Sequence, residues 1–305
     1  MLRTMNIRNK FQAFFSVLIL TLFTSTLLEA AEDKFDIYIP GSRGGKPGYL
    51  KNKNWVPLPG EGMATTVHVD GKDVYVSGNN EGYWKNSVWV DLTEHGMVRS
   101  ITSSHEAIYF LAKEGYWSLS KNNGELKWIK LKNNFANSIF ASGKDVYLAG
   151  YINDSNSNEF PAFWIGNKIT NLPMDKKWED IYFTFIQTSG KNIYVAASLQ
   201  RGCGEEVDFG YWENAKWISI PHDIDKSLDQ YTTALDSAIN GLGINKIDEE
   251  LIFAMLISEY KDDGSKTTKV SIIRNGKYKI LFQIPNSDFE EDYLHTRIFI
   301  AKSVK

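Results

Sequence analysis

Polar side chains gather in two segments of the sequence, and they define the candidate binding residues. The first segment, DSNSNE, offers side-chain oxygens at alternate positions, as calcium-binding loops do. It lacks the glycine and the distal glutamate of an EF-hand, which favours a solvated polar loop. The second segment, RGCGEEVD, places a guanidinium and three carboxylates beside the only cysteine. The binding residues that we predict are Asp154, Asn156, Glu159, Arg201, Glu205, Glu206 and Asp208.

Groups for catalysis or metal binding are sparse. None of the five histidines has metal-ligand spacing such as HExxH, and we expect them in turns or at the surface. They are His68, His95, His105, His222 and His295. Cys203 could act as a nucleophile, but the sequence places no histidine to activate it. We therefore predict no catalytic residue, no metal and no cofactor.

A repeat organises the chain into six copies of four short strands, a to d. Strand b carries an apolar residue followed by tyrosine or a close variant, as in DVYVSG at 73–78. Strand c carries the steps GYL, GYW, GYW, AFW, GYW and SII. Strand d carries the apolar stretches WVPLP, WVDLT, WIKLK, ITNLP, WISIP and ILFQIP. Glycine and asparagine occupy the a–b and c–d turns, where positive φ angles are required.

These repeats predict an all-β, six-bladed β-propeller of four-stranded blades. Apolar and polar residues alternate with period two, and Pro59, Pro173, Pro221 and Pro285 end strand d, which suits an outer edge. The first copy lacks strand a, and residues 296–304 near the C-terminus supply one, so we expect them to close the first blade. A β-sandwich or an irregular array of strands is the alternative. The sixth copy is the weakest, because its strand a could begin at Ala238 or near Ile244.

Length variation falls on one predicted face, which carries the b–c and d–a connections. The b–c connections of blades 4, 5 and 6 are long, at 151–161, 199–209 and 258–269. Loops on a rigid scaffold are common binding sites, whereas neutral insertion is the alternative origin of such lengths. The tryptophans of strands c and d could stack on sugars, but their fixed repeat position favours packing between blades.

Residues 1–31 have the order of a secretory signal peptide, with a basic start, an apolar run and small residues at its end. Residues 32–305 would then form a single propeller domain. Removal of residues 1–31 takes the formal charge from −3 to −5 and leaves no second apolar run that could span a bilayer. An acidic chain is a poor partner for nucleic acid.

The repeats resemble uncharacterised bacterial exported β-propeller proteins, whose blades read GxDVYVAG followed by a YWKNG-type step. The matching stretches here are GKDVYVSG with GYWKNS, GKDVYLAG with AFWIGN, and GKNIYVAAS with GYWENA. This resemblance implies the propeller architecture over nearly all of residues 35–305. It implies no activity.

From these features we expect a periplasmic or secreted, monomeric, non-catalytic module that holds a protein or glycan on the loop face of blades 4 to 6. The alternatives are a lyase or hydrolase at the central channel and a structural subunit of an envelope assembly. For the enzyme, only His68 and Asp70 on the predicted channel strands could move protons.

Overall fold

The computed structural model describes residues 35–92, 94–131, 135–153, 159–166, 168–175, 178–201, 206–219, 237–247, 250–260, 266–274, 277–284, 289–290 and 299–302. Contacts divide the chain into a large unit, Ile37–Ile300, and a small unit of Met1–Asp36 with Ala301–Lys305. The predicted signal segment lies outside the described residues. Within those residues, no helix has the length and apolar character needed to cross a bilayer.

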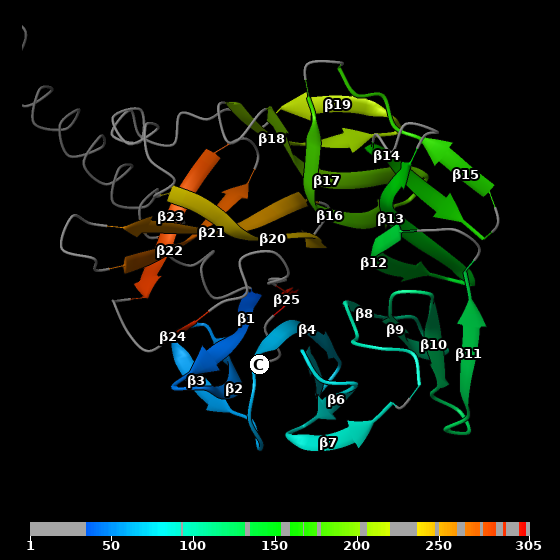
Figure 1. The fold of residues 1–305 in the computed structure, drawn as a ribbon, viewed down its shortest axis with the longest axis vertical. Coiled ribbons are helices and arrows are strands. Elements are labelled where there is room, and N and C mark those ends of the chain that lie inside the picture. Colours follow the sequence, from blue (N-terminus) through cyan, green and yellow to red (C-terminus); the bar gives the residue numbers. More distant parts are fainter. Residues whose placement is uncertain are drawn as a thin grey trace, which may run out of the picture. The chain divides into compact units, whose positions relative to one another are not determined.

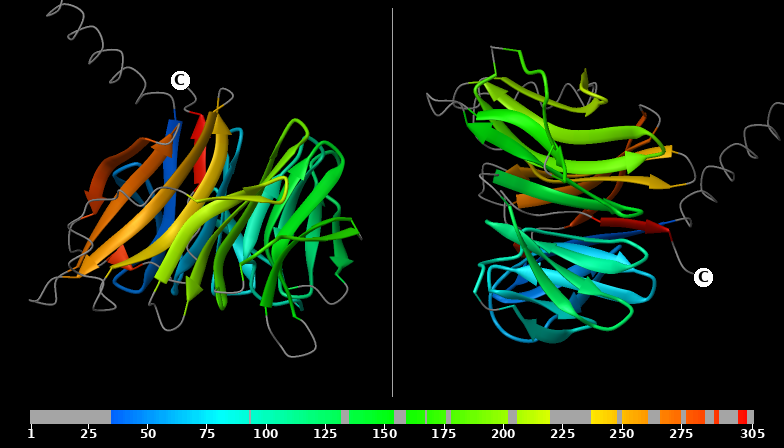
Figure 2. Two further views of the ribbon diagram at one scale, coloured as in Figure 1. Left: turned by 90° about the horizontal axis from the view of Figure 1, so that it is seen from above. Right: turned by 90° about the vertical axis from the view of Figure 1, so that its right-hand side faces the viewer.

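The large unit is all-β, and its four-stranded sheets are arranged as a β-propeller (Figure 1). Each sheet is antiparallel and meanders in chain order, as Figure 2 also shows. We call the sheet of each repeat a blade and keep the number of the repeat. Blade 2 holds β4 (Ala64–Asp70), β5 (Asp73–Gly78), β6 (Gly82–Lys85) and β7 (Val88–Asp91). Blade 3 holds β8 (Ser100–Ser103), β9 (Ala107–Leu111), β10 (Gly115–Ser120) and β11 (Leu126–Lys130).

The next three blades contain longer strands. Blade 4 holds β12 (Phe135–Ser142), β13 (Asp145–Asn153), β14 (Glu159–Ile165) and β15 (Lys168–Asn171). Blade 5 holds β16 (Asp180–Ser189), β17 (Asn192–Arg201), β18 (Glu206–Glu213) and β19 (Lys216–Ser219). Blade 6 holds β20 (Ser237–Ile247), β21 (Glu250–Tyr260), β22 (Lys266–Arg274) and β23 (Lys277–Ile284). Strand β20 covers both of the starts that the sequence left open for the sixth copy.

A further sheet contains the first copy of the repeat. It pairs β1 (Phe35–Arg43), β2 (Lys46–Lys51) and β3 (Asn54–Pro57) with two strands from the end of the chain. These are β24 (Phe289–Glu290), which the sequence did not predict, and β25 (Phe299–Lys302). The pairing of β25 with β1 agrees with the expected closure of the first copy by a C-terminal strand.

The first strand of each blade lies at the centre of the ring. Strand β4 contacts β8, β8 contacts β12, β12 contacts β16, and β16 contacts β20. Serine hydroxyls join neighbouring central strands, because the amide of Ile139 donates to Ser100 Oγ at 3.4 Å and that of Ile186 to Ser138 Oγ at 3.3 Å. The central strands therefore hold successive blades together without belonging to one sheet.

In the first, second and fifth repeats, an asparagine in the c–d turn connects strand c to strand b. Asn52, Asn86 and Asn214 have φ angles of 56°, 49° and 48°, a region that asparagine tolerates better than most residues. In each case the side-chain Oδ1 accepts a hydrogen bond from the first apolar residue of the strand b pair, at 2.8–3.0 Å. The predicted use of asparagine in these turns is confirmed.

The strand c tryptophans pack between blades, as the repeat predicted, whereas those of strand d lie over a glycine of their own blade and Trp89 is 37% exposed. Trp84, Trp164 and Trp212 of strand c are completely buried. Trp84 Nε1 donates to the carbonyl of Pro59 at 3.0 Å, and Trp212 Nε1 donates to that of Pro173 at 2.8 Å. The two prolines thus end an outer strand and also accept a hydrogen bond from the following blade.

The tryptophan of strand d packs directly on the glycine of strand c, where there is no room for a side chain. A Cβ atom at Gly115 would lie 2.6 Å from Trp128 Cζ2, and it would also strike the carbonyl oxygen of Ile129. Gly82 and Gly210 lie against Trp89 and Trp217 in the same way. The glycine of the GYW step is therefore required by the indole that covers it.

We expect Gly115→Ala to lower the free energy of unfolding by about 2 kcal/mol, because the new methyl group overpacks the contact with Trp128. Urea unfolding measures this change. In a Trp128→Ile background the same substitution should cost about 1 kcal/mol less, since neighbouring residues couple. Equal costs in both backgrounds would show that the indole is not the cause.

Removal of residues 299–305 should lower the melting temperature of the whole ring by several degrees. Ile300 is 1% exposed, and the ring of Phe299 lies 4.7 Å from that of His68 in blade 2, so the deletion exposes apolar surface in two sheets. Differential scanning calorimetry measures the shift. An unchanged melting temperature would contradict the role of β25 in closing the first copy.

Candidate functional site

The long connections of blades 4 to 6 are mostly strand, which corrects the expectation that they are loops. In blade 4 the pairing of β13 with β14 continues to Asn153 opposite Glu159. In blade 5 it continues to Arg201 opposite Glu206, and in blade 6 to Tyr260 opposite Lys266. Extended hairpins satisfy the backbone of the inserted residues, so these segments prolong the sheets beyond those of blades 2 and 3.

Aromatic side chains lie at the end of the blade 4 hairpin. Phe135 stacks on Tyr151 with ring centres 5.1 Å apart and planes at 4°, and it remains 41% exposed. Phe160 is 39% exposed on the other side of the same hairpin. Each of these rings offers apolar area that a partner could bury.

A carboxylate accompanies these rings. Glu159 pairs in register with Asn153 at the start of β14, and burial followed by repulsion from Asp180 raises its pKa. Burial also raises the pKa of Tyr151, with a further contribution from Glu159. Glu159 therefore belongs to a partly desolvated polar group at the tip of the hairpin, where a ligand hydroxyl or amide could meet it.

The remaining predicted binding residues fall in different environments. Asp208 accepts hydrogen bonds from Trp217 Nε1 at 2.9 Å and from Ser219 Oγ at 2.6 Å, so both of its oxygens stabilise blade 5. Arg201 is exposed at the end of β17, and Glu206 opposes it across the hairpin. Asp154, Asn156 and Glu205 lie outside the described residues, as does Cys203.

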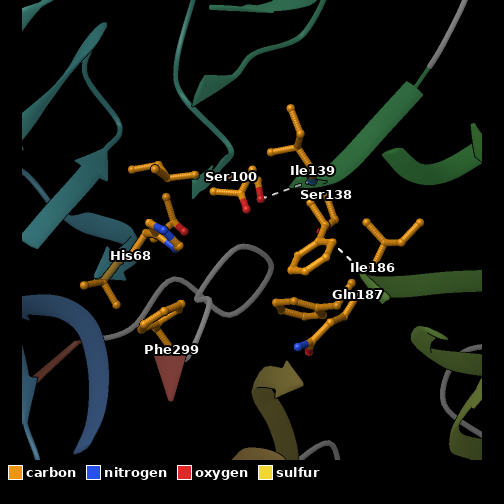
Figure 3. Close-up of a pocket in the computed structure, with 13 residues that line it drawn as sticks. His68, Ser100, Ser138, Ile139, Ile186, Gln187 and Phe299 are labelled. Atoms are coloured by element: carbon orange, nitrogen blue, oxygen red, sulfur yellow. Dashed lines mark hydrogen bonds between the residues drawn. The ribbon is translucent and has the colours of Figure 1, made fainter. Parts of the chain in front are cut away.

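A cavity of about 90 Å³ opens where the central strands meet. Hydroxyl groups of Thr66, Ser100, Thr102 and Ser138 line it, together with apolar side chains. Figure 3 shows His68 and Phe299 on one side of this cavity and Gln187 on the other. The volume suits a few water molecules rather than an organic substrate.

His68 is buried in this cavity, which corrects the expectation that the histidines lie in turns or at the surface. Burial lowers its pKa from 6.5 to about 4, and the nearby Asp70 opposes this only in part. His68 Nε2 lies 2.9 Å from Ser103 Oγ, and Ser103 Oγ donates to Asp70 Oδ1 at 3.2 Å. The imidazole is therefore neutral near pH 7.

One hydroxyl group lies between two neighbours here. The Ser103 hydroxyl is within hydrogen-bond distance of both His68 Nε2 and Asp70 Oδ1, and the tautomer of His68 decides whether Nε2 donates or accepts. Asp70 also pairs with Lys121 at 2.6 Å. These contacts join blade 2 to blade 3.

Metal-ligating residues are also scattered. In the described ranges, no group of three or more histidine, cysteine, aspartate or glutamate side chains is close enough to hold an ion. The sequence left two placements open for His68, a turn or surface position and a channel strand, and the structure agrees with the second.

Comparisons with known proteins bear on the fold alone. No family model and no curated protein matches the sequence. The structure is similar to TolB from Acinetobacter baumannii, with a TM-score of 0.54 and 9% identity over 87% of this chain and 66% of that one. It also matches the extracellular domain of a protein assigned as a one-component system in B. thetaiotaomicron, with a TM-score of 0.43 and 11% identity. That match covers 81% of this chain and 39% of the other.

This chain thus spans less than two thirds of either solved structure. The similarity to TolB agrees with the propeller arrangement of the blades.

His68→Gln should remove a component of the pH dependence of stability. The folded pKa of about 4 lies below the ordinary value of 6.5, so the unfolded chain takes up the proton first. The stabilisation is complete above pH 6.5 and is lost as the pH falls towards 4, a change of about 3 kcal/mol. Urea unfolding of both proteins at pH 7, 5 and 4 measures the difference, and parallel curves would contradict the buried neutral imidazole.

Proposed function

We propose that the protein is a non-catalytic binding module that holds a protein or glycan on the hairpin face of blades 4 to 6. The hairpin face is formed by the ends of β13–β14, β17–β18 and β21–β22. Two observations support this proposal most directly. The insertions of these blades extend paired strands, and Phe135 and Phe160 are exposed near the tip of blade 4. A β-structured wall is rigid, so binding to it costs little ordering entropy.

The chemistry of the blade 4 tip suits both partner classes. Aromatic rings bury large areas at protein interfaces, and they also stack on the apolar faces of sugars. Glu159 adds an acceptor that burial has already partly desolvated.

The blade number, oligomeric state and location of the module are also part of this proposal. The sheet of β1–β3 with β24 and β25 would be the sixth blade of a monomeric ring. The order of charged, apolar and small residues over 1–31 supports export to the periplasm or beyond. The proposed partner residues at the hairpin tips are Asp154, Asn156, Glu159, Arg201, Glu205 and Glu206, whereas Asp208 supports blade 5.

Shortening two hairpins should weaken partner binding and leave the fold intact, because the hairpin tips are removed while Phe135 and Phe160 remain. The register allows Ile152 to be joined to Phe160, and Gln200 to Val207, each through an Asn-Gly turn. This design keeps Asp208 and its two hydrogen bonds. Capture from an envelope extract and binding to a glycan array compare the intact and shortened proteins, with circular dichroism as the check on folding.

A point variant separates the aromatic contribution from hairpin length. Phe135→Ser with Phe160→Ser should weaken capture about tenfold or more, because exposed aromatic anchors carry much of the energy of an interface. Val88→Ser, at an exposed apolar residue of blade 2, is the matched control and should bind normally. Undiminished capture by the shortened protein would place the partner elsewhere.

A further inference from the structure

Buried hydroxyl groups from three successive blades line the central cavity. They come from strands β4, β8 and β12, and Figure 3 shows Ser100 and Ser138 along one side of the cavity. The four residues, each at most 5% exposed, are Thr66, Ser100, Thr102 and Ser138. Polar groups buried to this extent normally have hydrogen-bond partners, so the partners that these hydroxyls lack indicate what the cavity can hold.

These hydroxyl groups have hydrogen atoms left to donate. Ser100 Oγ and Ser138 Oγ each accept a hydrogen bond from a backbone amide of the next blade, so their own hydrogens need a separate acceptor. Among the described residues neither hydrogen has one, and the hydroxyls of Thr66 and Thr102 make no hydrogen bond there. A group that accepts from several of these buried donors at once is therefore stabilised in the cavity.

The rest of the lining favours an acceptor with a negative charge. Its other described members are an imidazole, an amide and apolar side chains, and no carboxylate is among them. Divalent cations in proteins are commonly bound through carboxylates, which the described lining does not offer. A hydrogen bond to an ionised acceptor is about twice as strong as one to a neutral acceptor, so an anion gains more from these hydroxyls than a water molecule does.

The size of the cavity limits which anions fit. Its volume of about 90 Å³ holds a few water molecules, and a chloride ion is only slightly larger than one of these. An organic acid with a chain of several carbon atoms is too large. The cavity therefore selects a small inorganic anion.

A positive charge must accompany a buried anion, because an isolated ion is strongly disfavoured away from water. The charged groups that act on His68 are Asp70 and Lys121, which pair with each other at 2.6 Å and so add little net charge. Tyr75, opposite His68 on β5, and Phe299 of β25 are uncharged near neutral pH. A proton on His68 therefore gives the cavity one positive charge.

The imidazole ring of His68 can carry this proton beside the cavity. Both nitrogens of an imidazolium donate, and Ser103 Oγ, 2.9 Å from Nε2, can accept one of these hydrogen bonds. Nδ1 carries the second N–H, and it has no partner in the described part of the chain. Burial lowers the pKa of His68 to about 4, whereas a nearby anion would favour the charged ring and raise this pKa.

We propose that the central cavity binds a monovalent anion of about the size of chloride together with a proton on His68. The hydroxyl groups donate to the anion, and the imidazolium balances its charge. Coupling between two ligands is reciprocal, so a lower pH strengthens anion binding by the same factor by which the anion favours protonation. The site lies among the central strands and is distinct from the hairpin face.

The test compares sodium bromide with sodium gluconate at an equal ionic strength of about 0.1 M, because gluconate has the same charge but is too large for the cavity. Urea unfolding at pH 5 and pH 7 over a series of bromide concentrations gives the Kd of the folded protein. We expect bromide to stabilise the protein at pH 5, with a Kd about tenfold lower than at pH 7. Anomalous diffraction from crystals grown in bromide locates the ion.

Variants of the lining make this expectation specific. Thr66→Val with Thr102→Val keeps the shape of both side chains and removes hydroxyls that bond to no described residue, so the fold should persist while bromide affinity falls about tenfold or more. Thr65→Val, at a buried threonine of β4 outside the lining, is the matched control and should bind normally. His68→Gln should make the bromide affinity equal at pH 5 and pH 7. Circular dichroism verifies that each variant folds.

Each other outcome overturns the proposal. Equal stability in bromide and gluconate at pH 5, or diffraction that shows water alone in the cavity, would mean that water fills it. Stabilisation that survives loss of the Thr66 and Thr102 hydroxyls would place the anion elsewhere, and an affinity independent of pH would separate it from His68. Shortening the blade 4 and blade 5 hairpins should leave bromide binding unchanged, so failure here and failure of the proposed function are distinguishable.

Discussion

The propeller depends on how indole rings pack at the junctions between blades. The strand c indole is buried against the preceding blade and, in blades 2 and 5, donates to the carbonyl that ends the outer strand of that blade. The strand d indole lies across the glycine of strand c and meets the first ring edge-on, as Trp84 and Trp89 do at 4.6 Å. One blade therefore provides both surface and acceptor for the next, and the order of the ring follows from a contact repeated within the sequence.

Because the contacts between blades lie in the middle of each blade, the length and sequence of the hairpin between strands b and c can vary. The indoles and the c–d asparagines fix the middle of a blade, whereas the hairpin between strands b and c projects beyond it. Blades 4 to 6 lengthen that hairpin by continuing its pairing, and the period of two is kept through residues such as Tyr151 and Phe160. A binding surface can thus change without disturbing the contacts that hold the ring.

Polar side chains of the central strands also connect successive blades. Ser100 and Ser138 bond to backbone amides of the next central strand, and His68 bonds to Ser103 of blade 3. Each of these side chains links one blade to its successor. Burial keeps His68 uncharged, and the described side chains that line the central cavity are imidazole, hydroxyl, amide, aliphatic and aromatic groups.

The sequence by itself determined the repeat, the all-β class, the turn chemistry and the burial of the strand c tryptophans, because these are local patterns that each copy repeats. Only the tertiary structure decided the surroundings of particular side chains, since these depend on residues from other blades or other strands. In the folded chain His68 lines the central cavity, and Asp208 accepts hydrogen bonds from Trp217 and Ser219. The segments of blades 4 to 6 that were expected to be loops are largely paired hairpins. The groove beside Ile169 likewise appears only when blades 3 and 4 are side by side, because its lining comes from both blades.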